Sequence, residues 1–453
     1  MSKKLFKEFN SVSSKAWKQK IQVDLKGADY NDTLIWKTNE DVNVKPFYHQ
    51  DDFEEISPLN IPANTFKIAQ SIFVADVKKS NKKAINAIKK GAESIFFSLP
   101  DKDISIEELL QNIDTTTTSI HFELQFADSE FIKQFESLSK DSKIYLHTDI
   151  IGHLAKSGNW FSNLNDDHTY LEKAVKTSAH LNSSLSVDLS LYQNAGATIT
   201  QQLAYGLAHA NEYLNHFKAD LKNPIVFNLS VGTNYFFEIA KIRALKTLWN
   251  TLASEYNIST PCHIFIKPTK RNKTLYDYNT NMLRTTTECM SAILGGGNTI
   301  CNLPYDAIYH KDNEFGERIA RNQLLILKNE SYFNAVSNAS DGSYYIESLT
   351  QQLAEKALDV FKTIEAGGGF LNQLKEGIIQ KKIKESANKE QKQFDAGELV
   401  LLGTNKHPNP NDKMKEELEI YPFLKINVRK TLIEPILEKR LSETTEQNRL
   451  KSE

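Results

Sequence analysis

Short apolar runs and helical stripes alternate over the middle of the chain. Leu203, Leu207, Ala210, Leu214 and Phe217, for example, recur at steps of four and three, which is typical of a helix with one apolar face. Eight apolar runs are typical of buried strands: 66–73, 94–99, 120–126, 143–147, 185–189, 225–229, 263–267 and 299–303. Strands that alternate with helices pair in parallel, so this pattern predicts an α/β fold with a (β/α)8 TIM-type barrel. An open doubly wound sheet is the alternative.

The segments that flank this pattern are expected to be an arm and an extension. Residues 1–60 form the arm, 61–370 the barrel, and 371–453 a helical C-terminal extension whose last ten residues are expected to fray. The expected elements of the extension are a helix over 378–395 and a short strand with a turn over 398–406. The arm carries several large apolar side chains with little partner sequence of its own, namely Trp17, Leu34, Trp36, Phe47 and Tyr48. They must pack either on this chain or on another subunit.

Composition narrows the class of protein. The chain has 453 residues, 40% of them apolar and 25% charged, and a formal net charge of -2. This balance predicts a soluble globular protein without the basic surface of a nucleic-acid or membrane binder. Three separated cysteines (Cys262, Cys289 and Cys301) suggest neither a disulfide framework nor a zinc site. Since the first ten residues are charged and no apolar run approaches the ~20 residues of a membrane span, we expect a cytoplasmic location.

Two features between residues 284 and 297 allow a functional or a structural interpretation. Gly295-Gly296-Gly297 could bind a phosphate, but the triplet follows a predicted helix instead of opening one, which favours a structural stop. Arg284 could bind a carboxylate or a phosphate, or anchor a loop through carbonyl groups, and the second role is slightly favoured.

Titratable residues give weak evidence for a site. The histidines are scattered, and the spacings of His147, His153 and Asp166-Asp167-His168 do not indicate a metal site. A barrel enzyme with chemistry of its own would need titratable groups at the carboxyl ends of its strands. Asp149, His153, Asp188 and Lys267 are the candidates.

Several blocks in order along the chain resemble the methylmalonyl-CoA mutases, the cobalamin-dependent acyl-CoA isomerases. Gln193-Asn194-Ala195-Gly196-Ala197 resembles the family's Gln-Glu-Ala-Gly-Ala motif, and residues 236–249 match a specific helix motif. The other blocks are Trp17 with Leu25-Lys26-Gly27, Thr33-Leu34-Ile35-Trp36, 44–48, 284–349 and 403–406. The resemblance covers nearly the whole chain and implies the barrel fold.

The chain departs from the family where the family's chemistry lies. Catalytic members have a Tyr-His pair at the positions of Ser190 and Leu191, and an Arg-Leu-Ser-Phe-Phe segment at 224–227. Their His-Thr-Asn-Ser stretch corresponds to Cys301-Asn302-Leu303-Pro304. The Tyr-Thr-Gly-Arg-Pro-Trp element expected near 58–70, the Asp-x-His-x-x-Gly motif and the flavodoxin-like cobalamin domain are not found in these 453 residues.

The resemblance therefore implies a non-catalytic small (beta) subunit of a heterodimeric mutase. Its large (alpha) partner subunit would bind adenosylcobalamin and interconvert methylmalonyl-CoA and succinyl-CoA. The small subunit would hold no cofactor and no metal, and Trp17, Leu34, Trp36, Phe47 and Tyr48 would contact the partner. The alternative is a catalytic barrel that borrows a separate cobalamin-binding subunit.

Overall fold

The computed structural model describes residues 8–53, 66–218, 221, 223–259, 261–426 and 428–453. A parallel sheet of eight strands, in the order β6-β5-β4-β3-β10-β9-β8-β7, forms its centre. The strands are β3 (Lys67–Phe73), β4 (Ser94–Leu99), β5 (Ser119–Leu124), β6 (Ile144–His147), β7 (Leu185–Asp188), β8 (Ile225–Val231), β9 (His263–Pro268) and β10 (Thr299–Cys301). They lie at the eight predicted runs.

The sheet closes between β6 and β7 through irregular contacts. The N–H of Leu146 donates to the carbonyl of Ser183 at 2.8 Å, and the N–H of Ser186 donates to the carbonyl of Thr148 at 3.0 Å. Because the strands follow one another in chain order around this closed sheet, the predicted TIM-type barrel is confirmed and the open sheet is wrong.

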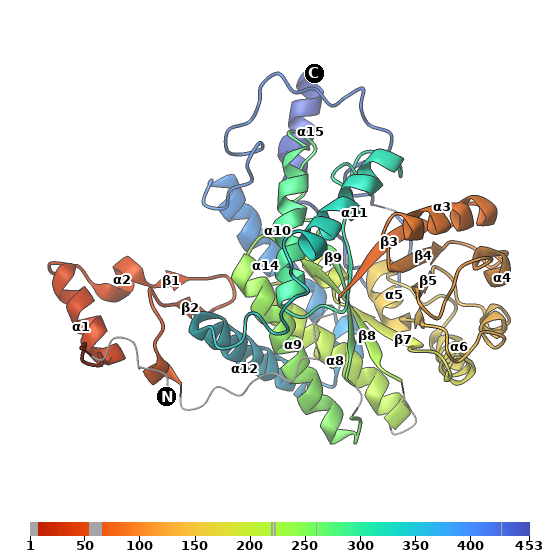
Figure 1. The fold of residues 1–453 in the computed structure, drawn as a ribbon, viewed down its shortest axis with the longest axis horizontal. Coiled ribbons are helices and arrows are strands. Elements are labelled where there is room, and N and C mark those ends of the chain that lie inside the picture. The colour runs from red at the N-terminus through yellow and green to blue at the C-terminus, as the bar shows by residue number, and fades with distance from the viewer. Residues whose placement is uncertain (1–7, 54–65, 219–220, 222, 260, 427) are drawn as a thin grey trace.

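Helices surround the barrel (Figure 1). They are α3 (Val77–Lys89), α4 (Ile106–Leu109), η2 (Phe131–Phe135), α5 (Ile150–Ser157), α6 (Leu164–Thr177), α7 (Ser190–Asn194), α8 (Ile199–Phe217), α9 (Tyr235–Glu255), α10 (Thr280–Leu294) and α11 (Glu314–Asn329). α9 is buried around most of its circumference, since α8, α10 and the later helix α12 (Tyr344–Ala366) all pack against it. The glycine triplet ends α10: a side chain at Gly297 would overlap Ile266 and Ile300, so the structural interpretation is confirmed.

The arm has two parts. Its elements are α1 (Ser14–Asp24), α2 (Tyr30–Leu34), β1 (Trp36–Lys37), β2 (Asn43–Val44) and η1 (Gln50–Asp52). Figure 1 shows α1 and α2 standing apart from the barrel, to which the β1–β2 ribbon joins them. The ribbon is fastened by Glu40, whose carboxylate accepts the N–H of Thr200 at the start of α8 (3.0 Å).

The C-terminal extension contains α13 (Phe370–Lys375), α14 (Ile378–Asp395) and α15 (Glu443–Ser452). The strand predicted over 398–406 is wrong, because only an isolated bridge between Leu402 and Lys406 forms there. The expected fraying of the last residues is also wrong. Glu446 is 1% exposed, accepts the N–H of Leu275 at 2.8 Å and pairs with Arg440 at 2.6 Å.

Candidate functional site

Ser190 and Leu191 lie just after β7, at the carboxyl end of the barrel. The hydroxyl of Ser190 donates to the carboxylate of Asp188, and the Ser190 N–H donates to the same oxygen at 2.9 Å. Leu191 is 1% exposed and belongs to the main apolar core. This segment of the mouth therefore offers a capped turn and an aliphatic side chain, and neither supplies a general acid.

The barrel axis is filled by aromatic and imidazole side chains. The ring of His121 on β5 lies 4.8 Å from that of Phe265 on β9, and Phe96 on β4 lies 5.0 Å from Phe265, between centroids. Tyr145 on β6 stacks on His121 at 4.5 Å. Since β5 and β9 are not neighbours in the sheet, these contacts cross the interior. The axis is thus a packed core and not a channel.

The imidazoles in this core are held neutral. Nδ1 of His121 lies 2.9 Å from Nε2 of His147, so one ring donates to the other. Burial lowers the pKa of His147 and of His263 to about 3, and it lowers the pKa of His121 well below its usual value. A protonated imidazole here would lose its hydration without gaining an anionic partner.

Val226, Leu191 and Leu303 occupy positions where catalytic members of the family have polar residues. The three side chains have different surroundings. Val226 is fully buried in the axial cluster with Phe96 and Phe265, so it contributes to the filling of the axis. Leu191 packs in the outer core, and Leu303 is half-buried beside the loop that follows β9.

The carboxyl ends of β5 to β8 surround a cavity of about 400 Å³ at the barrel mouth, which we call the mouth cavity. Asp149, His153 and Asp188 all line it, so three of the four titratable candidates converge. Lys267 does not line it, because its ammonium lies 3.7 Å from the centre of the Phe96 ring in the axis. Glu123 and Lys156 complete the charged lining.

Asp149 has a structural role in this cavity. Its Oδ1 accepts from the N–H of Gly152 (2.7 Å), the hydroxyl of Tyr213 (2.7 Å) and Nε2 of His209 (2.9 Å), and its Oδ2 accepts the N–H of Asp188 (2.9 Å). Burial alone would raise the pKa of Asp149, but these donors outweigh it and the pKa is lowered. The carboxylate thus caps α5 and ties β6 to β7 and α8.

The other titratable groups of the mouth cavity have shifted pKa values. Burial raises the pKa of Asp188 to about 6, and burial lowers the pKa of His153, which stacks on Phe161, to about 4. Burial opposes the charge of Lys156, but the carboxylates of Glu438, Asp188 and Glu123 outweigh it and raise the lysine pKa. The cavity can therefore hold polar ligands, although no nucleophile–base pair appears among these groups.

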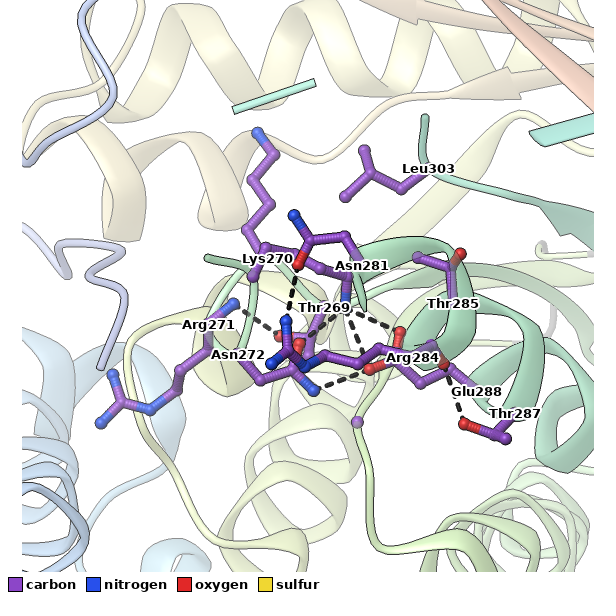
Figure 2. A network of polar contacts seen from close by, with 12 residues as sticks. Thr269, Lys270, Arg271, Asn272, Asn281, Arg284, Thr285, Thr287, Glu288 and Leu303 are labelled. Carbon is purple, nitrogen blue, oxygen red and sulfur yellow. Dashed lines mark hydrogen bonds and ion pairs between the residues drawn. The ribbon is translucent and has the colours of Figure 1, made fainter. Parts of the chain in front are cut away.

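Figure 2 shows a second polar cluster, between the loop that follows β9 and helix α10. The guanidinium of Arg284 donates to Thr274 Oγ1 and Asn281 Oδ1 at 2.9 Å each and to the carbonyl of Leu402 at 2.7 Å. Glu288 is 1% exposed and accepts from Asn272 (2.7 Å) and Lys273 (2.8 Å). The guanidinium of Arg284 thus donates to carbonyl and side-chain oxygens of the surrounding loops, which confirms its predicted loop-anchoring role.

Asp166-Asp167-His168, a partial match to the family's Asp-x-His-x-x-Gly motif, lies in the first turns of α6 and bonds locally. Both carboxylate oxygens of Asp167 accept backbone N–H groups, from Phe161 and Ser162, and Nδ1 of His168 lies 2.8 Å from the carbonyl of Leu164. The ring of His168 is thus bound to its own helix. Within the described ranges, no three His, Cys, Asp or Glu residues are grouped to hold a metal, and no helix has the length and apolarity to cross a membrane.

The arm residues predicted to contact a partner divide into two groups. Trp36 meets Phe237 of its own barrel edge-on at 5.8 Å but is still 52% exposed, and Tyr48 meets Tyr345 at 5.3 Å. Trp17 in α1 remains 44% exposed, although it stacks on Phe47 at 4.3 Å. Leu34 is half-buried at the end of α2.

Sequence reasoning missed the residues that fill the axis. His121, Tyr145 and His263 occupy alternate positions on strands whose other positions face the helices, as Ile120 and Phe122 do. Because side chains alternate along a strand, every second position of each run faces the barrel interior, and these positions could be found by that alternation. Interpreting each run as continuously apolar hides the alternation.

Comparison with known proteins agrees with this geometry. The methylmalonyl-CoA mutase family model matches residues 106–451. The methylmalonyl-CoA mutase small subunit of Porphyromonas gingivalis is 34% identical over 441 residues, covering 90% of this chain and 71% of that one. The large subunit from the same organism is 30% identical over 256 residues, covering 54% of this chain and 36% of that one.

Among solved structures, a Yersinia pestis dihydropteroate synthase aligns with a TM-score of 0.31 at 12% identity, covering 59% of this chain and 94% of that one. That likeness is too low to bear on function. The family match and the 34% identity over nearly the full length are decisive: the chain belongs to the methylmalonyl-CoA mutase family.

Proposed function

We propose that this chain is the non-catalytic small subunit of a heterodimeric methylmalonyl-CoA mutase. The large subunit would bind adenosylcobalamin and interconvert methylmalonyl-CoA and succinyl-CoA, while this subunit supports it. The observation that carries the proposal is the filled axis. His121, Phe96 and Phe265 touch across the interior, so an extended thioester would have no path along it.

The residues at the mouth support the same role. Ser190 is bound to Asp188 and Leu191 is buried, so the turn after β7 presents no acid to a substrate. Asp166-Asp167-His168, the partial match to the family's cobalamin motif Asp-x-His-x-x-Gly, has Leu171 in place of the glycine. Both features favour cofactor and substrate binding in the partner.

We infer that the outer part of the arm, residues 8–34, contacts the large subunit. Trp17, Val12 and Val23 are 44%, 59% and 72% exposed, and α1 contains no buried residue. Large apolar side chains on a projecting helix are typical of the anchors of a protein interface. The inner part, with Trp36, Phe47 and Tyr48, would orient this helix from the barrel surface.

The arm is tested by deleting residues 1–34, which keeps the ribbon that Glu40 fastens, and by Trp17→Asp. Both variants are co-expressed with the large subunit, and pull-down yield and the melting temperature of the isolated small subunit are measured. We expect a loss of yield of at least ~10-fold for either variant, because a central aromatic anchor contributes ~2 kcal/mol or more.

The matched control is Leu283→Asp, which places the same charge at a 69% exposed apolar residue of α10. It should leave the yield unchanged. A normal yield for Trp17→Asp together with a lowered melting temperature would show that α1 packs on its own chain.

The catalytic part of the proposal is tested with the reconstituted complex. The isolated chain should show no mutase activity with added adenosylcobalamin, whereas the large subunit with this chain should be active. Turnover by the isolated chain would refute the non-catalytic role.

A further inference from the structure

The mouth cavity contains polar atoms that lack protein partners. Nδ1 of His147 and Oδ1 of Asn228 make no hydrogen bond with the described residues, and the side chain of His147 is 5% exposed. Asn228 is near enough to His147 to affect its pKa, but the two groups do not reach hydrogen-bond geometry. Buried polar groups normally have partners, so these atoms indicate a polar occupant.

Charged groups of both signs line the cavity around these atoms. Ser98 donates to Oε2 of Glu123, and Ser190 donates to Oδ1 of Asp188. The second oxygen of each carboxylate accepts no hydrogen bond from the described part of the chain. Lys156, an exposed residue on the rim, makes no hydrogen bond or ion pair with the described residues, although the carboxylates of Glu438, Asp188 and Glu123 are near enough to raise its pKa. Asp149 is excluded as a ligand group, because its oxygens already accept four bonds.

The size and walls of the cavity suit a small molecule. Its volume of about 400 Å³ lies within the range of ~300–1,000 Å³ that is usual for ligand sites. Leu124, Phe126 and Phe161 give it an apolar side. A ligand can therefore place a short carbon skeleton against these residues and its polar ends among the charged groups.

We propose that the mouth cavity binds a small zwitterion of the α-amino acid class. The ligand ammonium lies between the free oxygens of Glu123 and Asp188, and the ligand carboxylate pairs with Lys156. A simple anion would pair with Lys156 but would meet the two carboxylates. A simple amine would pair with the carboxylates of Glu123 and Asp188, which otherwise stabilise the charge of Lys156, and would bring no anion to replace them. Only a molecule with both charges complements the lining, and this site does not depend on the proposed subunit role.

The experiment measures the melting temperature of the full chain with millimolar alanine, serine, leucine or glutamate at constant ionic strength. Each amino acid is compared with an analogue that lacks one charge, such as 4-methylpentanoate and 3-methylbutylamine for leucine. A ligand that binds only the folded state stabilises it. At least one amino acid should raise the melting temperature by about 2 °C or more, and its single-charge analogues should not.

Isothermal titration of the best ligand then tests the residues. Lys156→Met, Glu123→Gln and Asp188→Asn should each weaken binding at least ~10-fold, since each removes one charge of a pair. Lys176→Met, at an exposed lysine on α6, should bind as the wild type does. Equal stabilisation by the carboxylate alone, unchanged affinity in Lys156→Met, or no response to any amino acid would each overturn the proposal.

Discussion

The neutral histidines of the axis make the fold sensitive to acid, and His147 allows the effect to be measured. In the unfolded chain this imidazole titrates near ~6.5, whereas burial lowers its pKa to about 3 in the folded protein. The unfolded state therefore binds a proton between these values and the folded state does not. The contribution of His147 to stability is complete above pH ~6.5 and decreases as the pH falls toward 3.

The size of the effect follows from proton linkage. At pH 5 a single group with these two pKa values lowers the free energy of unfolding by about 2 kcal/mol relative to pH 8. His263, with the same pKa, adds a similar amount. A total of about 4 kcal/mol is a large share of the ~5–15 kcal/mol that stabilises a typical domain.

The test replaces His147 with glutamine, whose amide nitrogen can still reach Nδ1 of His121. Urea unfolding is measured at pH 8, 6.5 and 5 for the wild type and for His147→Gln. The wild type should lose about 2 kcal/mol more than the variant between pH 8 and pH 5. The quantity compared is the change in the free energy of unfolding between pH 8 and pH 5. Any loss of stability that the substitution causes equally at all pH values therefore cancels.

His407→Asn is the matched control, because His407 is exposed at a positive φ of 51° that asparagine tolerates. Its loss of stability with pH should equal that of the wild type. If wild type and His147→Gln lose the same free energy within ~0.5 kcal/mol, the axial imidazole is not the acid-sensitive group.

Substitutions and a C-terminal deletion test the packing around the barrel in three further places. Lys241→Met leaves the 2%-exposed carboxylate of Glu238 without its ion partner and should cost about 3–5 kcal/mol in urea unfolding; Glu238→Gln in the same chain should restore part of it. Deleting residues 443–453 removes the partner of buried Arg440 and should lower the melting temperature, whereas deleting 451–453 alone should lower it less. Phe265→Ala should cost about 3–5 kcal/mol, because it empties the centre of the axis; an equal melting temperature would contradict the packed interior.

The barrel could be predicted because each strand and helix carries its own period. The run at 94–99 became β4 at the same residues, and the segment at 378–395 became α14. The absence of a strand over 398–406 and the ordered, buried C-terminal helix could not be predicted, because both depend on contacts with residues far away in the sequence. Glu446 is charged and has no apolar neighbour in sequence, and it is buried only because Arg440 and the Leu275 N–H lie beside it in the fold.

The candidate site could be predicted only in part. Asp149, His153 and Asp188 were expected at strand ends, where the barrel geometry brings them together. Whether a carboxylate is free or fully hydrogen-bonded depends on side chains from other elements, such as Tyr213 and His209 for Asp149. No local pattern in the sequence contains that information.

The hydrogen bond between Leu275 and Glu446 also determines how long part of the fold stays incomplete during synthesis of the chain. The two residues are 171 positions apart, so at ~5–20 residues per second a ribosome needs roughly 9–34 s to make the acceptor after the donor. Once β10 (Thr299–Cys301) has been made, the nascent barrel has all its strands, but for the rest of that interval it lacks Arg440, Glu446 and the segment that covers the loop after β9. The loop after β9 therefore reaches its final structure only after Glu446 has been made, and encounters with other proteins before then involve an incomplete surface.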